Sequence, residues 1–138
     1  MFPIHFSTIA VSQLHQYNSR MRFGEPCGVG VDIVELARVK NIRFLTRFAE
    51  FFLTPAEMKS FKKHINPIGF IASRFAAKEA AIKAFPGFLS PHEIELQKNA
   101  LKPTIRFCSP KKAKRYKALV SISHSTDYAA GYAVVFKK

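Results

Sequence analysis

The sequence predicts a single domain that mixes helices with β-strands, and three observations carry this expectation. The stretch from Ser73 to Phe85 is rich in Ala, contains no Gly or Pro, and has the apolar spacing of a helix. Alternating apolar residues after Gly28, and again near the C-terminal end, indicate strands. The length of 138 residues and the hydrophobic content of 48% suit one ordered domain with its own core.

The central helix has charged side chains where a core helix would have aliphatic ones. At 3.6 residues per turn, its apolar stripe consists of Ile71, Phe75, Ile82 and Phe85. Lys78 falls on this stripe, and Glu79 and Lys83 lie one turn apart beside it. Three charges near a buried face suit a site for a charged ligand. The structural alternative is a Glu79–Lys83 pair on a solvated face, worth only ~0.3–0.5 kcal/mol. The helix alone leaves both interpretations open.

The chain is strongly basic, because 22 Lys and Arg residues face 9 Asp and Glu residues and give a formal charge of +13. This imbalance indicates a polyanionic partner, which could be nucleic acid, an anionic membrane, a phosphorylated small molecule or an acidic protein. No apolar run approaches the roughly 18 residues of a transmembrane helix. Cys27 and Cys108 form neither a disulfide framework nor a metal-ligand cluster. We interpret both as reduced thiols of a cytoplasmic protein.

The first predicted strand, Gly28 to Glu35, contains an unusual aspartate. Val29, Val31 and Ile33 alternate along it, and Asp32 lies on the opposite face. Aspartate is disfavoured inside strands, so Asp32 is explained by metal ligation, by a phosphate-site role, or by a strand end turning into the next helix. The residues before this strand show no clear pattern. They are interpreted as an N-terminal extension, 1–27, to a domain of 28–138.

Apolar residues at helical spacing from Leu36 to Phe52 predict one helix, and its charges have a single sign. Arg38, Lys40, Arg43 and Arg47 occur there with no acid between Glu35 and Glu50, which suggests a docking surface for an acidic partner. Two further helix starts are predicted, by the capping box of residues 54–57 and by residues 66–67, the latter opening the central helix.

The C-terminal half is predicted to contain strands on both sides of one basic segment. Strands are expected at residues 94–96, 103–107, 118–124 and 128–136, with a turn from Asn99 to Lys102 and the last strand in a central position. Five Lys and Arg residues between 111 and 117 form either a solvated helix or a phosphate-attracting surface. No dinucleotide fingerprint, nucleophile elbow or metal-ligand spacing of His occurs.

Three segments of the chain together resemble the holo-acyl-carrier-protein synthases, the small trimeric type of the 4'-phosphopantetheinyl transferase superfamily. The segments are Gly28–Glu35, Arg74–Ala84 and Ser121–His124, and the turn near Asn99 also resembles the family. The resemblance covers Gly28 to Phe136. It implies an α+β fold with a small antiparallel sheet packed against a long helix, in a homotrimer with active sites between subunits.

The resemblance also implies a reaction and the residues that perform it. The phosphopantetheine arm of coenzyme A would move to a serine of an acyl carrier protein in fatty acid biosynthesis, releasing 3',5'-ADP. Asp32 and Glu79 would hold Mg²⁺, which needs few carboxylates when a diphosphate supplies oxygens. Lys83 would act beside them on the leaving phosphate, chiefly by charge neutralisation. Glu79 or a metal-bound water could take the serine proton, and the sequence leaves this open.

The remaining implied contacts concern coenzyme A and the carrier. The expected coenzyme A contacts are Arg74, Lys78, Lys83, Ser123 and His124. The acidic carrier protein would meet the basic residues Arg38, Arg43 and Arg47, where complementary charge chiefly sets on-rate and specificity. After its central helix the family usually has a Gly-rich run near coenzyme A, whereas this chain has the bulkier Phe85-Pro86-Gly87-Phe88.

Two other functions compete with this interpretation. A basic nucleic-acid-binding domain would explain the charge, but it leaves Asp32 and Glu79 without a role and lacks an aromatic–basic platform. An inactive scaffold would keep the fold, but it does not explain the intact set of Asp32, Glu79 and Lys83. We therefore expect an enzyme that binds neither nucleic acid nor a membrane.

Overall fold

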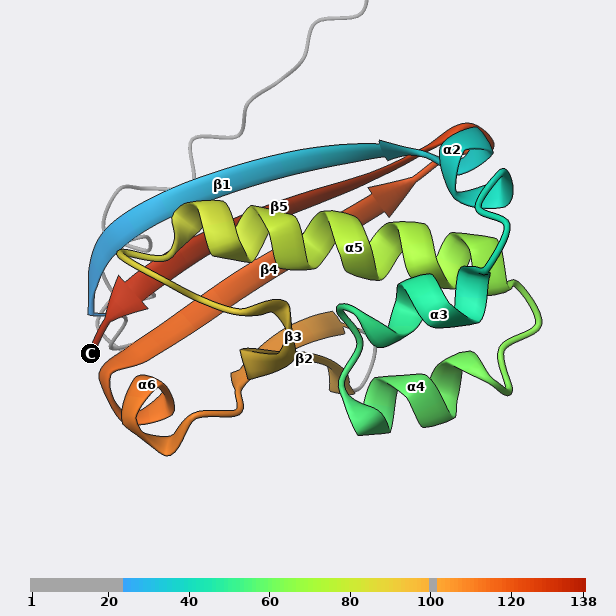
Figure 1. The fold of residues 1–138 in the computed structure, drawn as a ribbon. Helices are drawn as coiled ribbons and strands as arrows, with labels where there is room; N and C mark the ends of the chain where they lie inside the picture. Colours follow the sequence, from blue (N-terminus) through green and yellow to red (C-terminus); the bar gives the residue numbers. More distant parts are fainter. Residues whose placement is uncertain (1–23, 100–101) are drawn as a thin grey trace, which may run out of the picture.

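The structure is a computed structural model, and it describes residues 24–99 and 102–138 (Figure 1). Within these residues the predicted mixture of helices and strands is confirmed. The strands are β1 (Glu25–Glu35), β2 (Ile94–Asn99), β3 (Lys102–Phe107), β4 (Tyr116–His124) and β5 (Tyr128–Lys137). The helices are α2 (Leu36–Lys40), α3 (Leu45–Glu50), α4 (Pro55–Phe61), α5 (Pro67–Ala84) and α6 (Pro110–Arg115), with a 3-10 turn η1 at Pro91–Glu93.

The strands form two antiparallel sheets. The larger has the order β1-β5-β4, so the last strand is central as predicted, and the smaller pairs β2 with β3. β1 begins at Glu25, three positions before the expected Gly28. The middle of the predicted turn from Asn99 to Lys102 lies outside the described residues, as does most of the predicted 1–27 extension.

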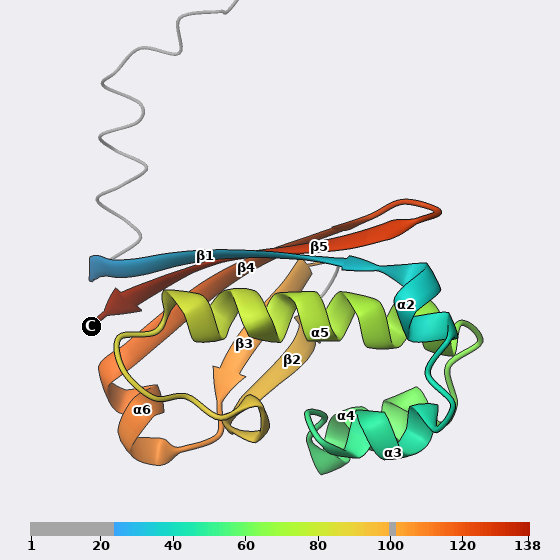
Figure 2. The ribbon, with the colours of Figure 1, turned by 45° about the horizontal axis from the view of Figure 1, so that its top comes forward.

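The long helix α5 lies along one face of the larger sheet, as Figure 2 shows. Its sheet-facing side is a row of buried alanines, Ala76, Ala80 and Ala84. Opposite them the strands have glycines: a Cβ on Gly30 would lie 2.0 Å from the Ala80 carbonyl oxygen, and one on Gly131 would lie 2.4 Å from that of Ala76. Only residues without a side chain allow this approach, so the helix backbone rests almost directly on the sheet.

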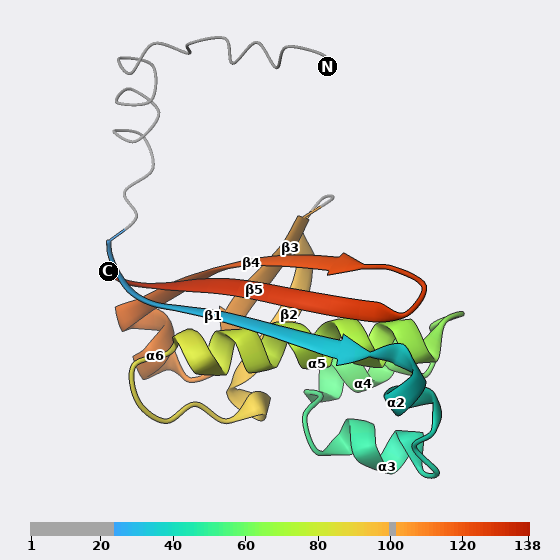
Figure 3. The same ribbon diagram turned by 90° about the horizontal axis from the view of Figure 1, so that it is seen from above.

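No described element covers the other face of the larger sheet (Figure 3). The exposed side chains on this face are largely apolar. Val29, Val31 and Ile33 of β1 are 61%, 63% and 66% exposed. Leu119 and Tyr132 continue the patch onto β4 and β5. The predicted alternation of β1 is therefore correct, but Val29, Val31 and Ile33 point outward, while Gly30 and Asp32 face the helix.

The prediction of one helix from Leu36 to Phe52 is wrong, because the chain turns at residues 41–44 and forms α2 and α3 instead. Both helices bury an apolar residue, Val39 and Ala49, in a core cluster that includes Phe70 and Ile71 of α5. A straight helix would direct only one end of this segment onto α5, whereas the turn lets both parts pack there.

The two predicted helix starts are confirmed. Thr54 caps α4 in a complete capping box with Glu57, and the Asn66 side chain accepts from the Gly69 amide at the start of α5. α5 ends at Ala84, just before Pro86 and Gly87. None of the described helices has the length and apolar character needed to cross a bilayer.

Candidate functional site

Asp32 and Lys83 form an ion pair at the edge of the larger sheet. Asp32 lies on the face of β1 that meets α5, and its side chain is 18% exposed. The Lys83 ammonium donates to Asp32 Oδ1 at 2.8 Å and to the Val31 carbonyl oxygen at 3.0 Å. Because the Lys83 side chain is 52% exposed, the pair is open to solvent and to a ligand.

Glu79 lies one turn before Lys83 on the same side of α5. Burial is the main cause that raises the pKa of Glu79, and the negative charge of Asp32 raises it further, while Lys83 opposes the shift. The two carboxylates are thus close enough to repel each other, although they come from a strand and a helix 47 positions apart. A hard divalent cation with oxygen preference fits this donor set, provided that water and a diphosphate complete its coordination. No group of three or more His, Cys, Asp or Glu residues suited to a metal occurs in the described part of the chain.

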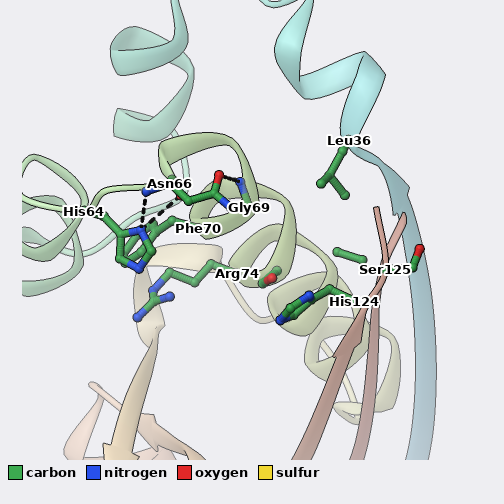
Figure 4. Close-up of a pocket in the computed structure, with 10 residues that line it drawn as sticks. Leu36, His64, Asn66, Gly69, Phe70, Arg74, His124 and Ser125 are labelled. Carbon is green, nitrogen blue, oxygen red and sulfur yellow. Dashed lines mark hydrogen bonds between the residues drawn. The ribbon is translucent and has the colours of Figure 1, made fainter. Parts of the chain in front are cut away.

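A cavity opens on the other flank of α5, beside the end of β4 (Figure 4). His64, Phe70 and Arg74 lie on one side of it, and His124 and Ser125 lie on the other. A second cavity, lined mainly by the β2–β3 hairpin and Ile122, shares two residues with the first: Arg74 and His124. The cationic Arg74 and the titratable His124 therefore form the wall between the two cavities, where an anionic ligand would contact both.

Arg74 is held by the Phe70 ring and by the carboxylate of Glu57 from helix α4. Its guanidinium carbon lies 3.6 Å from the centre of the Phe70 ring, which favours a cation over its face. Its Nε lies 4.0 Å from Glu57 Oε1, is buried, and has no hydrogen-bond partner among the described residues. Burial is the main influence on the pKa of Arg74 and lowers it, and Glu57 partly offsets this.

The Asp32–Glu79–Lys83 group and the Arg74–His124 group do not meet within one chain. Glu79 follows Arg74 by five positions, which places them about 140° apart around a helix of 3.6 residues per turn. Asp32 lies on β1 and His124 on β4, the two outer strands of the sheet. The predicted site residues are thus divided between opposite flanks of α5.

Two predicted coenzyme A contacts lie elsewhere. Ser123 points to the exposed apolar face of the sheet, because it pairs with Ala130 and alternates with His124. Lys78 is only 1% exposed, and its ammonium donates to Glu57 Oε2 and the Phe52 carbonyl oxygen, both at 2.6 Å, and to the Pro91 carbonyl oxygen at 3.0 Å. All three of its donors are used inside the chain, so the Lys78 ammonium is not available to a phosphate.

The predicted docking residues remain exposed although their helix is divided. Arg38 lies on α2, Arg43 in the following turn and Arg47 on α3. None of the three forms an ion pair among the described residues. Phe44 and Phe51 beside them are 62% and 70% exposed. The surface is therefore basic with apolar side chains, and the apolar part was not anticipated from the sequence.

A comparison with models of protein families shows which family this chain belongs to. The family model of the 4'-phosphopantetheinyl transferase superfamily matches residues 28–133. This chain belongs to the 4'-phosphopantetheinyl transferase superfamily. The family predicted from the three sequence segments is thereby confirmed.

Three relatives match this chain over nearly their whole length. The holo-[acyl-carrier-protein] synthase of Buchnera aphidicola subsp. Schizaphis graminum is 39% identical over 122 residues, which are 80% of this chain and 97% of that protein. The crystal structure of the Neisseria meningitidis holo-[acyl-carrier-protein] synthase aligns with a TM-score of 0.69 and 32% identity, over 82% of this chain and 99% of that one. The Bacillus anthracis synthase, solved in complex with coenzyme A (3',5'-ADP), aligns with a TM-score of 0.67 and 33% identity. The alignment covers 82% of this chain and 97% of that one. The α+β fold predicted from the superfamily is therefore confirmed.

Proposed function

We propose that this chain transfers the 4'-phosphopantetheine group of coenzyme A to a serine hydroxyl of an apo-acyl carrier protein in fatty acid biosynthesis. The serine oxygen bonds to the phosphorus that carries the pantetheine arm and gives up its proton to Glu79 or to a water. The bond from that phosphorus to the oxygen bridging to the other phosphate breaks, and 3',5'-ADP leaves. The observation that carries the proposal is the gathering of Asp32, Glu79 and Lys83 on one flank of α5, in a chain of the phosphopantetheinyl transferase superfamily. The two free cysteines of the chain are compatible with a cytoplasmic enzyme.

Asp32 and Glu79 would hold Mg²⁺. When bound, the ion supplies positive charge against the diphosphate, whose transfer depends mainly on positioning and charge neutralisation. The raised pKa of Glu79, caused first by burial and then by Asp32, supports this assignment, because a cation between the carboxylates would relieve their repulsion. Lys83 contacts Asp32 at 2.8 Å, and its ammonium would neutralise charge that develops on the leaving phosphate.

Arg74 and His124 would bind the phosphates of coenzyme A from the opposite flank of α5. Support comes from their shared position between the two cavities. Arginine suits this role because its planar guanidinium presents several donors to a phosphate. Ser123 joins this proposed set only if a neighbouring subunit brings the outer sheet face against the ligand.

We further propose that the enzyme is a homotrimer with its sites between subunits. One copy would supply Asp32 and Glu79, and the next would supply Arg74 and His124. The division of these residues between opposite flanks supports this, since a single copy cannot present both groups to one small ligand. The exposed face of Val29, Val31 and Ile33 is the kind of apolar surface that a second copy covers.

The acidic carrier protein would dock on the surface formed by Arg38, Arg43 and Arg47. Complementary charge would speed the encounter, and Phe44 and Phe51 would supply apolar contact once the proteins meet. This places the carrier beside α2, directly after β1 and Asp32 in the chain.

The test is transfer to a carrier followed by mass spectrometry. The purified chain is mixed with apo-acyl carrier protein, coenzyme A and Mg²⁺, and the carrier should gain the mass of one phosphopantetheine. The gain should disappear with EDTA and with Asp32→Ala, whereas Glu93→Gln should retain it, because Glu93 pairs with Lys112 and lines neither cavity. No mass gain with any carrier or divalent metal would overturn the proposal.

A further inference from the structure

The proposed reaction leaves one buried ion pair without a role. Glu57 of α4 and Lys78 of α5 are 2% and 1% exposed, and their side chains meet at 2.6 Å. Charges are rarely buried to this degree, and an apolar pair of similar volume often stabilises a fold as well. Stability alone therefore does not explain why this pair lies in the core.

The Glu57 carboxylate is fixed from several directions. Oε2 accepts from the Thr54 amide at 2.9 Å and from Lys78, and Oε1 accepts from the Leu96 amide at 3.0 Å. These donors belong to the start of α4, to α5 and to β2. Lys78 is equally fixed, because carbonyl oxygens at residues 52 and 91 occupy its other two donors. The position of the carboxylate is thus determined by three separate elements.

Arg74 is the cation nearest to Glu57 after Lys78. It lies one turn before Lys78 on α5, with its Nε 4.0 Å from Glu57 Oε1. That Nε is buried and has no hydrogen-bond partner among the described residues, while the Arg74 side chain, 24% exposed, lines both cavities. Arg74 therefore has one end directed by the interior and the other available to a ligand.

We propose that Glu57 and Lys78 are positioning residues that hold the Arg74 guanidinium at the wall between the two cavities for an anionic group of coenzyme A. The pair works as a unit. Lys78 compensates most of the Glu57 charge, so Glu57 attracts Arg74 enough to orient it but does not withdraw it from the cavities. Phe70 completes the placement by stacking under the guanidinium at 3.6 Å. This inference rests on the proposed coenzyme A-dependent transfer.

The inference predicts a change in coenzyme A recognition without a change in the chemical step. Glu57→Gln removes the orienting charge and should raise KM for coenzyme A about tenfold, the usual scale for a displaced charged contact, with kcat retained. Arg74→Ala should raise KM at least as much. The double variant should be no worse than Arg74→Ala alone, because Glu57 acts only through Arg74. Glu93→Gln, which removes a carboxylate from a different lysine pair, is the matched control and should leave KM unchanged.

A second variant keeps the test valid if Glu57→Gln fails to fold. Glu57→Gln combined with Lys78→Met removes both charges at similar volume, so the core retains its packing. This variant should also show a raised KM. An unchanged KM in either folded variant, a loss confined to kcat, or losses that add to that of Arg74→Ala would each overturn the inference.

Calorimetry of coenzyme A binding separates this inference from the proposed function. If the unsubstituted chain transfers no phosphopantetheine but binds coenzyme A, and Glu57→Gln weakens that binding about tenfold, the positioning role stands and the proposed reaction fails. If transfer occurs and Glu57→Gln binds coenzyme A normally, the reaction stands and the positioning role fails.

Discussion

Replacing Gly30 by alanine tests whether the close approach of α5 to the sheet sets the geometry of the acidic pair. The new Cβ would lie 2.0 Å from the Ala80 carbonyl oxygen. An ordinary contact of 3.4 Å is 1.4 Å further, and the obstructing atom is helix backbone, which cannot rotate away. Strand β1 and helix α5 must therefore separate locally by about this amount.

The separation should reduce both stability and activity. Overpacking costs roughly 1–3 kcal/mol, and a clash with backbone belongs at the upper end, near ~3 kcal/mol. Asp32 lies two positions along the same strand on the same face, so the shift also moves it from Glu79. A displacement of about 1 Å in a catalytic arrangement lowers the rate on the order of 100-fold.

Denaturant unfolding and the carrier transfer assay measure the two effects. Gly69→Ala is the matched control for the unfolding measurement, because its Cβ meets the movable Asn66 side chain at 2.7 Å and a helical alanine offsets that cost. Its stability should change by less than ~1 kcal/mol. If Gly30→Ala is as stable and as active as the unsubstituted chain, helix-to-sheet contact does not set the geometry of the site.

Three further predictions concern other parts of the molecule. Arg38→Glu should raise KM for the carrier while coenzyme A binding persists in calorimetry, and equal loss of both would contradict a separate docking surface. Thr54→Ala should lower the free energy of unfolding by ~1–2 kcal/mol, measured in urea, because it removes the α4 cap; an unchanged midpoint would contradict this. The hydrogen bond from Lys112 lowers the pKa of Glu93 below 4.5. The Lys112–Glu93 pair therefore stabilises the fold fully above that pH, and this stabilisation is lost as the pH falls below it. Unfolding curves measured above and below pH 4.5 should therefore show that acid lowers the free energy of unfolding less in Glu93→Gln than in the unsubstituted chain. An equal loss in both proteins would contradict the role of the pair.

Lys78 illustrates how far the sequence could go. Helical spacing correctly placed it on the buried stripe, but its charge was interpreted as part of a site for a charged ligand, whereas it pairs with Glu57 in the core. The partner was not identifiable, because Glu57 lies 21 positions away on another helix. Its capping role at α4 was visible in the residues that follow Thr54, but its second role depends on how α4 packs against α5. Local patterns contain no information about that packing.

In the segment from Leu36 to Phe52, the sequence predicted one continuous helix that the fold does not contain. Its apolar spacing is truly helical, yet the chain turns at residues 41–44 so that Val39 and Ala49 both reach α5. Tertiary packing here outweighs a continuous periodicity. The exposed face of β1 could likewise not be assigned, because alternation identifies two faces without saying which one is buried. The glycines opposite Ala76 and Ala80 decide that question, and their partners appear only in the folded chain.

Activity of mixed subunits tests the division of the site between copies most directly. Asp32→Ala chains, inactive in transfer, and Arg74→Ala chains, of low activity at limiting coenzyme A, are co-expressed with different tags and purified as mixed oligomers. If each site takes Asp32 from one copy and Arg74 from the next, every mixed trimer contains one restored site of its three, so roughly a third of the sites are restored. Activity of the mixed oligomers near that level is the predicted result. Activity no higher than that of the two single variants would contradict the shared site.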